Sequence, residues 1–164
     1  MRYRHERRDA GMTIAEVLVV VAIIGILLVV TIPNFTAFLR AYRAGTAVDQ
    51  MVSMINAARQ RAVTERETHL FIAFGTPQDR WEVRRGGTTI FDGELPDGVD
   101  ITTGGVFLFN PNGACATPTG YTGTTPTSQF LRVEGTVTPS RTDRYTFEVS
   151  PVGRVKTTQE KLTS

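Results

Sequence analysis

The pattern of apolar and polar residues divides the chain into three parts. A short basic segment is followed by an apolar run over residues 17–30, interrupted by Gly25. As a helix rising 1.5 Å per residue, the roughly twenty residues of 12–33 would cross a hydrocarbon core of about 30 Å. Because a helix satisfies its own backbone hydrogen bonds in lipid, this run predicts a membrane-spanning helix over 12–33.

Beyond Pro33 the apolar residues take the spacing of an amphipathic helix. Between residues 39 and 62 they recur three or four positions apart, and charged residues mostly occupy the other faces. We therefore expect the helix to continue over 34–66 and to pack one face on a folded domain. A helix of about fifty residues is long for a globular protein, which favours a role in a membrane or an assembly.

From Thr68 onward apolar and polar residues alternate with the period of β-strands. The sequence predicts strands at 69–74, 80–85, 88–91, 99–102, 106–109, 130–134, 145–150 and 154–157. Residues 114–128 are rich in Thr, Gly and Pro and are expected to form a flexible surface loop. The predicted fold class is therefore α+β, with one long helix packed on an antiparallel sheet domain over 67–164.

Glu16 is the one carboxylate inside the apolar stretch. A carboxylate within a membrane helix costs roughly 2.5–3.5 kcal/mol on insertion scales and is usually retained for function. An ordinary secretory signal peptide would have a shorter apolar core and a small-x-small cleavage site, and no convincing site follows Val30. A plain membrane anchor accounts for the length of the run but not for Glu16.

Residues 11–16, GMTIAE, together with the apolar run and Pro33, resemble the N-terminal signature of type IV pilins and type II secretion pseudopilins. In that family a prepilin peptidase in the membrane cuts after the glycine and methylates the new N-terminus. The resemblance implies cleavage between Gly11 and Met12, N-methylation of Met12, and assembly roles for Glu16 and Pro33. Met12 stands where Phe is usual, and Ala15 replaces a larger aliphatic residue.

The resemblance also implies a location and a mode of assembly. Residues 1–11 would be a leader, whose arginines favour a cytoplasmic N-terminus and a periplasmic C-terminal domain on a bacterial inner membrane. From there an inner-membrane assembly platform would add the subunit to other pilins or pseudopilins in a helical filament. Within the filament Glu16 would meet the charged α-amine of a neighbouring Met12. Alternatively, Glu16 bonds to the N-terminus of its own helix.

The C-terminal part is similar to the H-type pseudopilins of the general secretion pathway and to FimT-like minor pilins. The residues that carry this likeness are Phe109, Pro111, Gly113, Ser150, Pro151, Gly153 and Arg154. FimT-like minor pilins can bind DNA through a Gly-Arg-x-Arg pattern, and this chain has Lys156 at the last position. Lysine keeps the charge there but loses bidentate contact. Arg154, Lys156 and Arg144 are therefore the candidate DNA-binding residues.

Two functions remain open at this point. The first is a minor subunit of a type II secretion pseudopilus or a type IV pilus, with a role in protein secretion or pilus assembly. The second is a FimT-like minor pilin that binds DNA for natural transformation. The net charge is +2, and removing the leader leaves 14 basic and 14 acidic residues. This neutral balance is a weak electrostatic footprint for nucleic acid.

The sequence contains no convincing pattern for enzymatic chemistry or for a cofactor. Cys115 is the single cysteine, so no internal disulfide is possible. His69 is the one histidine outside the leader. The acidic residues between 92 and 100 do not follow the spacing of a calcium-binding EF-hand loop, which favours a solvated acidic loop over a metal site.

Overall fold

The computed structural model describes residues 12–116 and 130–163, apart from the side chains at 30, 31, 33 and 34. The chain divides into two compact units, Met1–Thr36 and Ala37–Ser164, which we describe separately. The predicted leader 1–11, including Gly11, lies outside the described residues, as does the part of the predicted loop 114–128 that follows residue 116.

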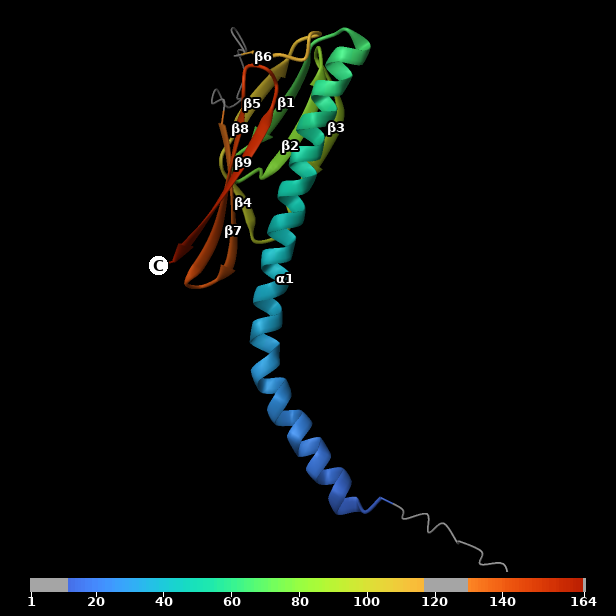
Figure 1. Ribbon diagram of the computed structural model, residues 1–164, viewed down its shortest axis with the longest axis vertical. Helices are drawn as coiled ribbons and strands as arrows, with labels where there is room; N and C mark the ends of the chain where they lie inside the picture. The colour runs from blue at the N-terminus through green and yellow to red at the C-terminus, as the bar shows by residue number, and fades with distance from the viewer. Residues whose placement is uncertain (1–11, 117–129, 164) are drawn as a thin grey trace, which may run out of the picture. The chain divides into compact units, whose positions relative to one another are not determined.

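One helix, α1, extends over Ile14–Glu65, and Pro33 lies within these bounds (Figure 1). The predicted helix over 34–66 agrees with this end to within one residue. Arg66 follows with a backbone φ of 55°, a left-handed conformation of the kind that often terminates helices.

In the described part of the second unit, nine strands form two antiparallel sheets. A five-stranded sheet has the order β3-β2-β1-β5-β6, and a four-stranded sheet has the order β4-β7-β8-β9 (Figure 1). The bounds are β1 His69–Phe74, β2 Arg80–Arg85, β3 Thr88–Glu94, β4 Val99–Thr103, β5 Gly105–Phe109, β6 Cys115–Ala116, β7 Phe130–Thr138, β8 Arg141–Val149 and β9 Val155–Thr163. The α+β class with antiparallel pairing is confirmed, whereas the division into two sheets was not predicted.

The core lies between α1 and the faces of the sheets turned toward it. The buried face of the helix is formed mainly by small and medium apolar residues, namely Ala44, Ala47, Val48, Met51, Ile55, Ala58 and Ala62. Aromatic side chains of the five-stranded sheet fill the space against them, with Phe71 stacked between Trp81 and Phe107. The three-and-four spacing of these helix residues is the amphipathic pattern that predicted the packing.

β1 is buried at all six positions because both of its faces are covered. Phe71 and Ala73 belong to the main core, whereas Leu70, Ile72 and Phe74 form a second apolar cluster with Val106. β8 instead alternates buried Tyr145 and Phe147 with more exposed neighbours, the pattern of a strand with one face in water.

Candidate functional site

The first turn of α1 contains Glu16, the acidic residue of the pilin-like N-terminal signature GMTIAE. The backbone N–H of Glu16 donates to the hydroxyl of Thr13 at 3.3 Å and to its carbonyl at 3.1 Å. Thr13 therefore caps the helix, in the Thr-x-x-Glu arrangement typical of helix N-termini. The Glu16 side chain is exposed, and its carboxylate has no hydrogen-bond or ion-pair partner within the described part of the chain. The cap thus uses the amide of Glu16 and leaves its carboxylate available.

The apolar side chains around this acid are exposed in the single chain. Among the large apolar residues described between Met12 and Ile32, Val17 is the least exposed, at 45%, and Ile14 reaches 83%. A continuous apolar surface of this kind indicates an interaction with lipid or with other proteins. Within the ranges described, no helix satisfies the length and apolarity required of a membrane span.

The three candidate DNA-binding residues differ in their surroundings. Arg154 and Lys156 are exposed at the start of β9, where Lys156 lies opposite Glu148. Arg144, by contrast, is held by acids of both neighbouring strands: its Nε donates to Glu134 at 2.6 Å, and its Nη1 lies 3.9 Å from Glu160. The structure therefore brings Arg154 and Lys156 together but engages Arg144 in a separate network.

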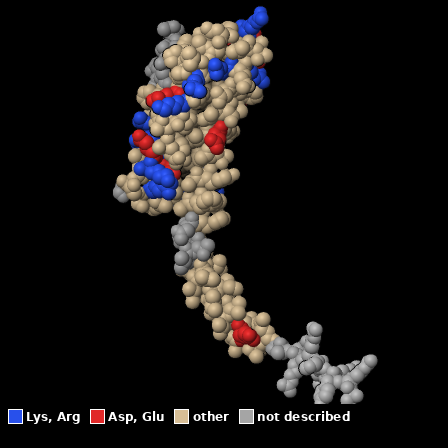
Figure 2. Space-filling view, viewed as in Figure 1, with Lys and Arg blue, Asp and Glu red and all other residues tan. Residues whose placement is uncertain are grey.

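Arg141, whose strand position is opposite Thr163 of β9, is also neutralised. Arg141 makes a two-pronged contact with the buried carboxylate of Asp143, at 2.9 and 2.8 Å. Figure 2 shows basic and acidic side chains next to one another on the visible face of this unit. Such mixing weakens the field that would attract a polyanion.

Arg59 of α1 fixes the turn that precedes Arg154. Its Nε donates to the Gly113 carbonyl and its Nη2 to the Val152 carbonyl, each at 3.1 Å. Gly113 and Gly153 adopt left-handed backbone conformations, with φ of 77° and 78°. The Arg59 guanidinium thus attaches to the helix two turns that are about forty residues apart in the sequence. Both glycines were noted in the sequence as part of the likeness to H-type pseudopilins, but Arg59 was not, because a lone arginine on a helix carries no sign of what it contacts.

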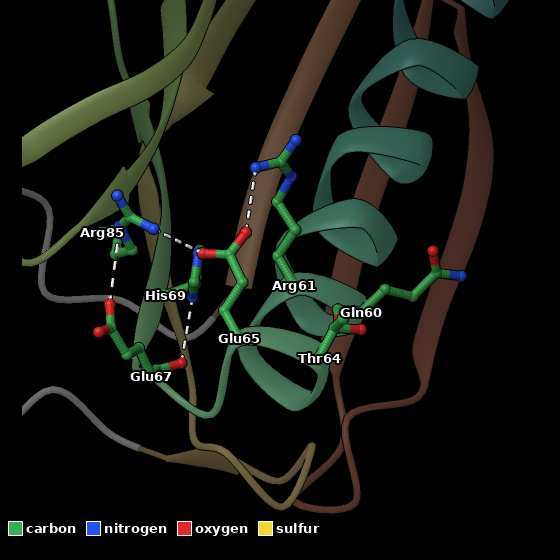
Figure 3. A network of polar contacts seen from close by, with 7 residues as sticks. All are labelled: Gln60, Arg61, Thr64, Glu65, Glu67, His69 and Arg85. Atoms are coloured by element: carbon green, nitrogen blue, oxygen red, sulfur yellow. Dashed lines mark hydrogen bonds and ion pairs between the residues drawn. The ribbon is translucent and has the colours of Figure 1, made fainter.

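A polar network joins the last turn of α1 to the five-stranded sheet (Figure 3). The Glu65 carboxylate accepts hydrogen bonds from Arg61 at 3.2 Å and Arg85 at 2.9 Å, and lies 3.3 Å from Nε2 of the fully buried His69. Nδ1 of His69 donates to the Glu67 carbonyl at 3.1 Å. Partial removal from water opposes ionisation, but the Arg85 hydrogen bond and the proximity of His69, Arg85 and Arg61 hold the pKa of Glu65 below its ordinary value.

A second network lies on β2, where the nearly buried Glu82 bridges Arg80 and Arg84. The Arg84 Nε donates to Glu82 at 2.6 Å, and the Thr89 hydroxyl donates to it at 3.3 Å. Although burial opposes ionisation, the hydrogen bonds from Arg84 and Arg80 and the charges of these two arginines lower the pKa of the Glu82 carboxyl. Both networks have the features of structural ion pairs.

The His69 ring is held through its Nδ1, while its buried Nε2 faces the Glu65 carboxylate without a hydrogen bond. Within residues 12–116 and 130–163, no three His, Cys, Asp or Glu side chains are grouped closely enough to hold a metal ion. Burial raises the pKa of the Cys115 thiol, which makes it a poor nucleophile.

Comparison with known proteins identifies one family feature. The prokaryotic N-terminal methylation motif matches residues 7–32, which include Gly11, Met12 and Glu16. No curated protein and no solved structure matches the chain. This motif is the type found in type IV pilins and pseudopilins, which are structural proteins, and here it covers less than a sixth of the chain. Proteins with the motif are in general processed by prepilin peptidase and assembled into pilus-type filaments.

Proposed function

We propose that this chain is an H-type minor pilin or pseudopilin, a structural subunit of a type II secretion pseudopilus or a type IV pilus. Prepilin peptidase would cut between Gly11 and Met12 and methylate Met12. Before assembly, residues 12–33 would anchor the subunit in the bacterial inner membrane, with the leader in the cytoplasm and 67–164 in the periplasm. The match of residues 7–32 to the methylation motif carries this proposal.

The chemistry of assembly follows from the first turn of α1. The methylated α-amine of Met12 has an ordinary pKa near 8 and remains charged at neutral pH. When the apolar helices of several subunits pack together, a buried Glu16 carboxylate needs a cationic partner. The amine of a neighbouring Met12 supplies it, and the exposed carboxylate of Glu16 is available for that contact. Helices that pack in the wrong register would leave both charges without partners.

Substitution of Glu16 tests this proposal. Glu16→Ala and Glu16→Gln both remove the charge, and Gln keeps the shape and polarity of the side chain. We expect both variants to be cleaved normally and to accumulate in the membrane with little incorporation into filaments. The measurement is the ratio of subunit in sheared filaments to subunit in membranes. Incorporation of both variants at the parental level would show that the pairing does not occur.

The alternative is a FimT-like minor pilin that binds DNA. It is favoured by one observation, the exposure of Arg154 and Lys156, which make no ion pair with any described residue. The neighbouring Glu148 and the engagement of Arg144 by Glu134 make the site less basic than the sequence alone indicates.

A further inference from the structure

A recess of about 370 Å³ lies beside α1 near the point where the chain enters the second unit. Its lining includes Tyr42, Arg43, Thr46 and Gln50 from the helix and Leu95 and Pro96 from the turn that follows β3. This volume is in the range of pockets that bind small molecules. Because apolar and polar side chains line the recess together, its charge decides which ligand it accepts.

The helix side of the recess is basic. Arg43 is exposed and makes no ion pair with any described residue, and the same is true of Arg40, which is three positions earlier on the same helix surface. Glu94 also borders the recess, but it is opposite Arg80 in the β2–β3 ladder. That position is on the face of the sheet away from the core residue Trp81, so the Glu94 side chain is directed away from α1. An anionic group can therefore approach Arg43.

A stacked pair of exposed aromatic rings adjoins the recess. The ring centroids of Phe38 and Tyr42 are 6.4 Å apart with an angle of 22° between the ring planes. The two residues are 63% and 64% exposed, and Tyr42 is also part of the recess lining. Exposed aromatic rings beside basic side chains are typical of the interface between a membrane and water. The recess and the ring pair thus form one surface with the character of a lipid contact.

The sequence places this surface directly after the apolar run. No charged residue occurs between Glu16 and Arg40. From Pro33, the end of the proposed anchor, to Arg40 and Arg43 is about 10 and 15 Å of helix. The polar layer on each side of a bilayer is about 5–8 Å thick. Because side chains on a helix tilt toward its N-terminus, the two long arginines extend back toward the membrane and within reach of lipid phosphates.

We propose that this recess binds the headgroup of an anionic phospholipid from the membrane in which the chain is anchored. Arg43 and Arg40 bind the phosphate, for which the planar guanidinium has matching geometry. The Gln50 amide is available to hydroxyl groups of the headgroup, and an acyl chain lies against the Phe38 ring. The inference rests on the proposed function, which supplies the membrane anchor, and goes beyond it by assigning a lipid to the waiting subunit.

Native mass spectrometry of the full-length mature chain in mild detergent tests the site. The chain is offered equal amounts of phosphatidylglycerol, which is anionic, and phosphatidylcholine with the same acyl chains. We expect phosphatidylglycerol to remain bound in about tenfold excess, and equal retention of the two lipids would overturn the proposal. Glycerol 3-phosphate at the same concentration should not displace the lipid. Displacement would indicate a site for soluble phosphates instead and would contradict the proposal.

A pair of charge-removing variants separates the recess from general attraction. Arg40→Gln with Arg43→Gln keeps polar side chains that favour a helix, and should lower the excess of phosphatidylglycerol about tenfold. Arg66→Gln with Lys161→Gln is the matched control, since it removes the same charge from exposed positions outside the recess. The control should retain the parental excess. An equal loss in both double variants would show that the lipid responds to net charge alone, and the recess would not be its site.

Photolabelling locates the lipid in a bilayer. Vesicles that contain the full-length mature chain and phosphatidylglycerol with a diazirine in its headgroup are irradiated, and the labelled peptide is identified by mass spectrometry. We expect the label between residues 40 and 50. Labelling of β9 in its place would contradict the proposal.

Failure of the lipid site can be distinguished from failure of the proposed function. If no excess of phosphatidylglycerol is found while Met12 is the methylated N-terminus, the lipid site is wrong and the assignment as a pilin-type subunit stands. If Met12 is not the N-terminus of the mature chain, the proposed function fails, and the inference loses its basis.

Discussion

Gly153 and Gly113 are in direct backbone contact. A Cβ added to Gly153 would lie 2.3 Å from the carbonyl oxygen of Gly113 and 2.6 Å from the Arg59 Nε. The same carbonyl accepts the hydrogen bond of that Nε. Two turns and one helix therefore meet at a point with no room for a side chain. The next residue, Arg154, donates its backbone N–H to the Ser150 hydroxyl at 3.0 Å.

Gly153→Ala should consequently destabilise the fold. The methyl group must displace Gly113 or Arg59, and alanine is strained at a φ of 78°, so we expect a loss of about 3 kcal/mol. Gly86→Ala is the matched control, since Gly86 has a φ of 58° and open space around it. The control should cost about 1 kcal/mol from backbone strain alone. Urea unfolding followed by the fluorescence of the buried Trp81 measures both; equal losses would show that the close contact is unimportant.

Gly135 on β7 makes a similar approach to α1. A Cβ there would lie 2.6 Å from the Cβ of Ala44. We expect Gly135→Ala to destabilise the fold by about 2 kcal/mol, because overpacking forces the helix away from the strand. Ala44→Gly removes the opposing methyl group and should partly rescue Gly135→Ala, although it costs about 1 kcal/mol by itself. A double-mutant cycle measures the coupling. Strictly additive effects would contradict the contact.

Stability should fall in acid because of Glu65 and Glu82. The folded state lowers the pKa of both carboxyls, whereas in the unfolded chain their pKa is about 4.3. The two carboxylates therefore make their full contribution to the free energy of unfolding above the unfolded-state pKa. This contribution is lost as the pH falls through the lower pKa values of the folded state. Glu82→Gln should cost about 2 kcal/mol at pH 7 and flatten the decline below pH 5. The measurement is the urea midpoint from pH 7 to pH 3; an unchanged acid slope in Glu82→Gln would contradict this account.

Binding to duplex DNA distinguishes a filament subunit from a DNA-binding minor pilin and can be measured directly. Phosphate contacts release counterions, so binding through Arg154 and Lys156 would weaken steeply with salt. We expect no electrophoretic shift of a duplex DNA probe even at low salt. The reason is that Glu148, Glu134 and Glu160 lie among the basic residues of the four-stranded sheet. The double variant Arg154→Ala, Lys156→Ala is the control. A salt-sensitive shift that the double variant loses would establish DNA binding.

The sequence predicted those features of the fold that depend on local pattern. The helix face from Val48 to Ala62 was found because burial imposes a period of 3.6 on it. The strand β1 was found as a short, mostly apolar run, since it is buried on both faces. β7, β8 and β9 are each nine residues long, longer than expected. Their extra residues are mostly polar: β9 contributes Thr, Gln, Glu and Lys, and such residues show no alternation that marks a strand.

Features that depend on distant contacts were not predicted. β4 and β5 are separated by Gly104 alone, yet they belong to different sheets, because Val99 pairs with Gly135 on β7 while Phe109 pairs with His69 on β1. Arg144 was predicted from its charge to extend a basic patch. Its acidic partners became visible only when the register of β7, β8 and β9 brought Glu134 and Glu160 beside it.

The most direct test of the whole account is the mass of the N-terminal peptide of the mature protein, isolated from membranes of cells with an active prepilin peptidase. The account predicts a peptide that begins at Met12 and carries one methyl group on its α-amine. Gly11→Val should leave the full-length precursor instead, because a side chain there obstructs the approach of the peptidase to the backbone. A mature N-terminus at any other residue, or an unmodified chain that still begins at Met1, would contradict the central claim.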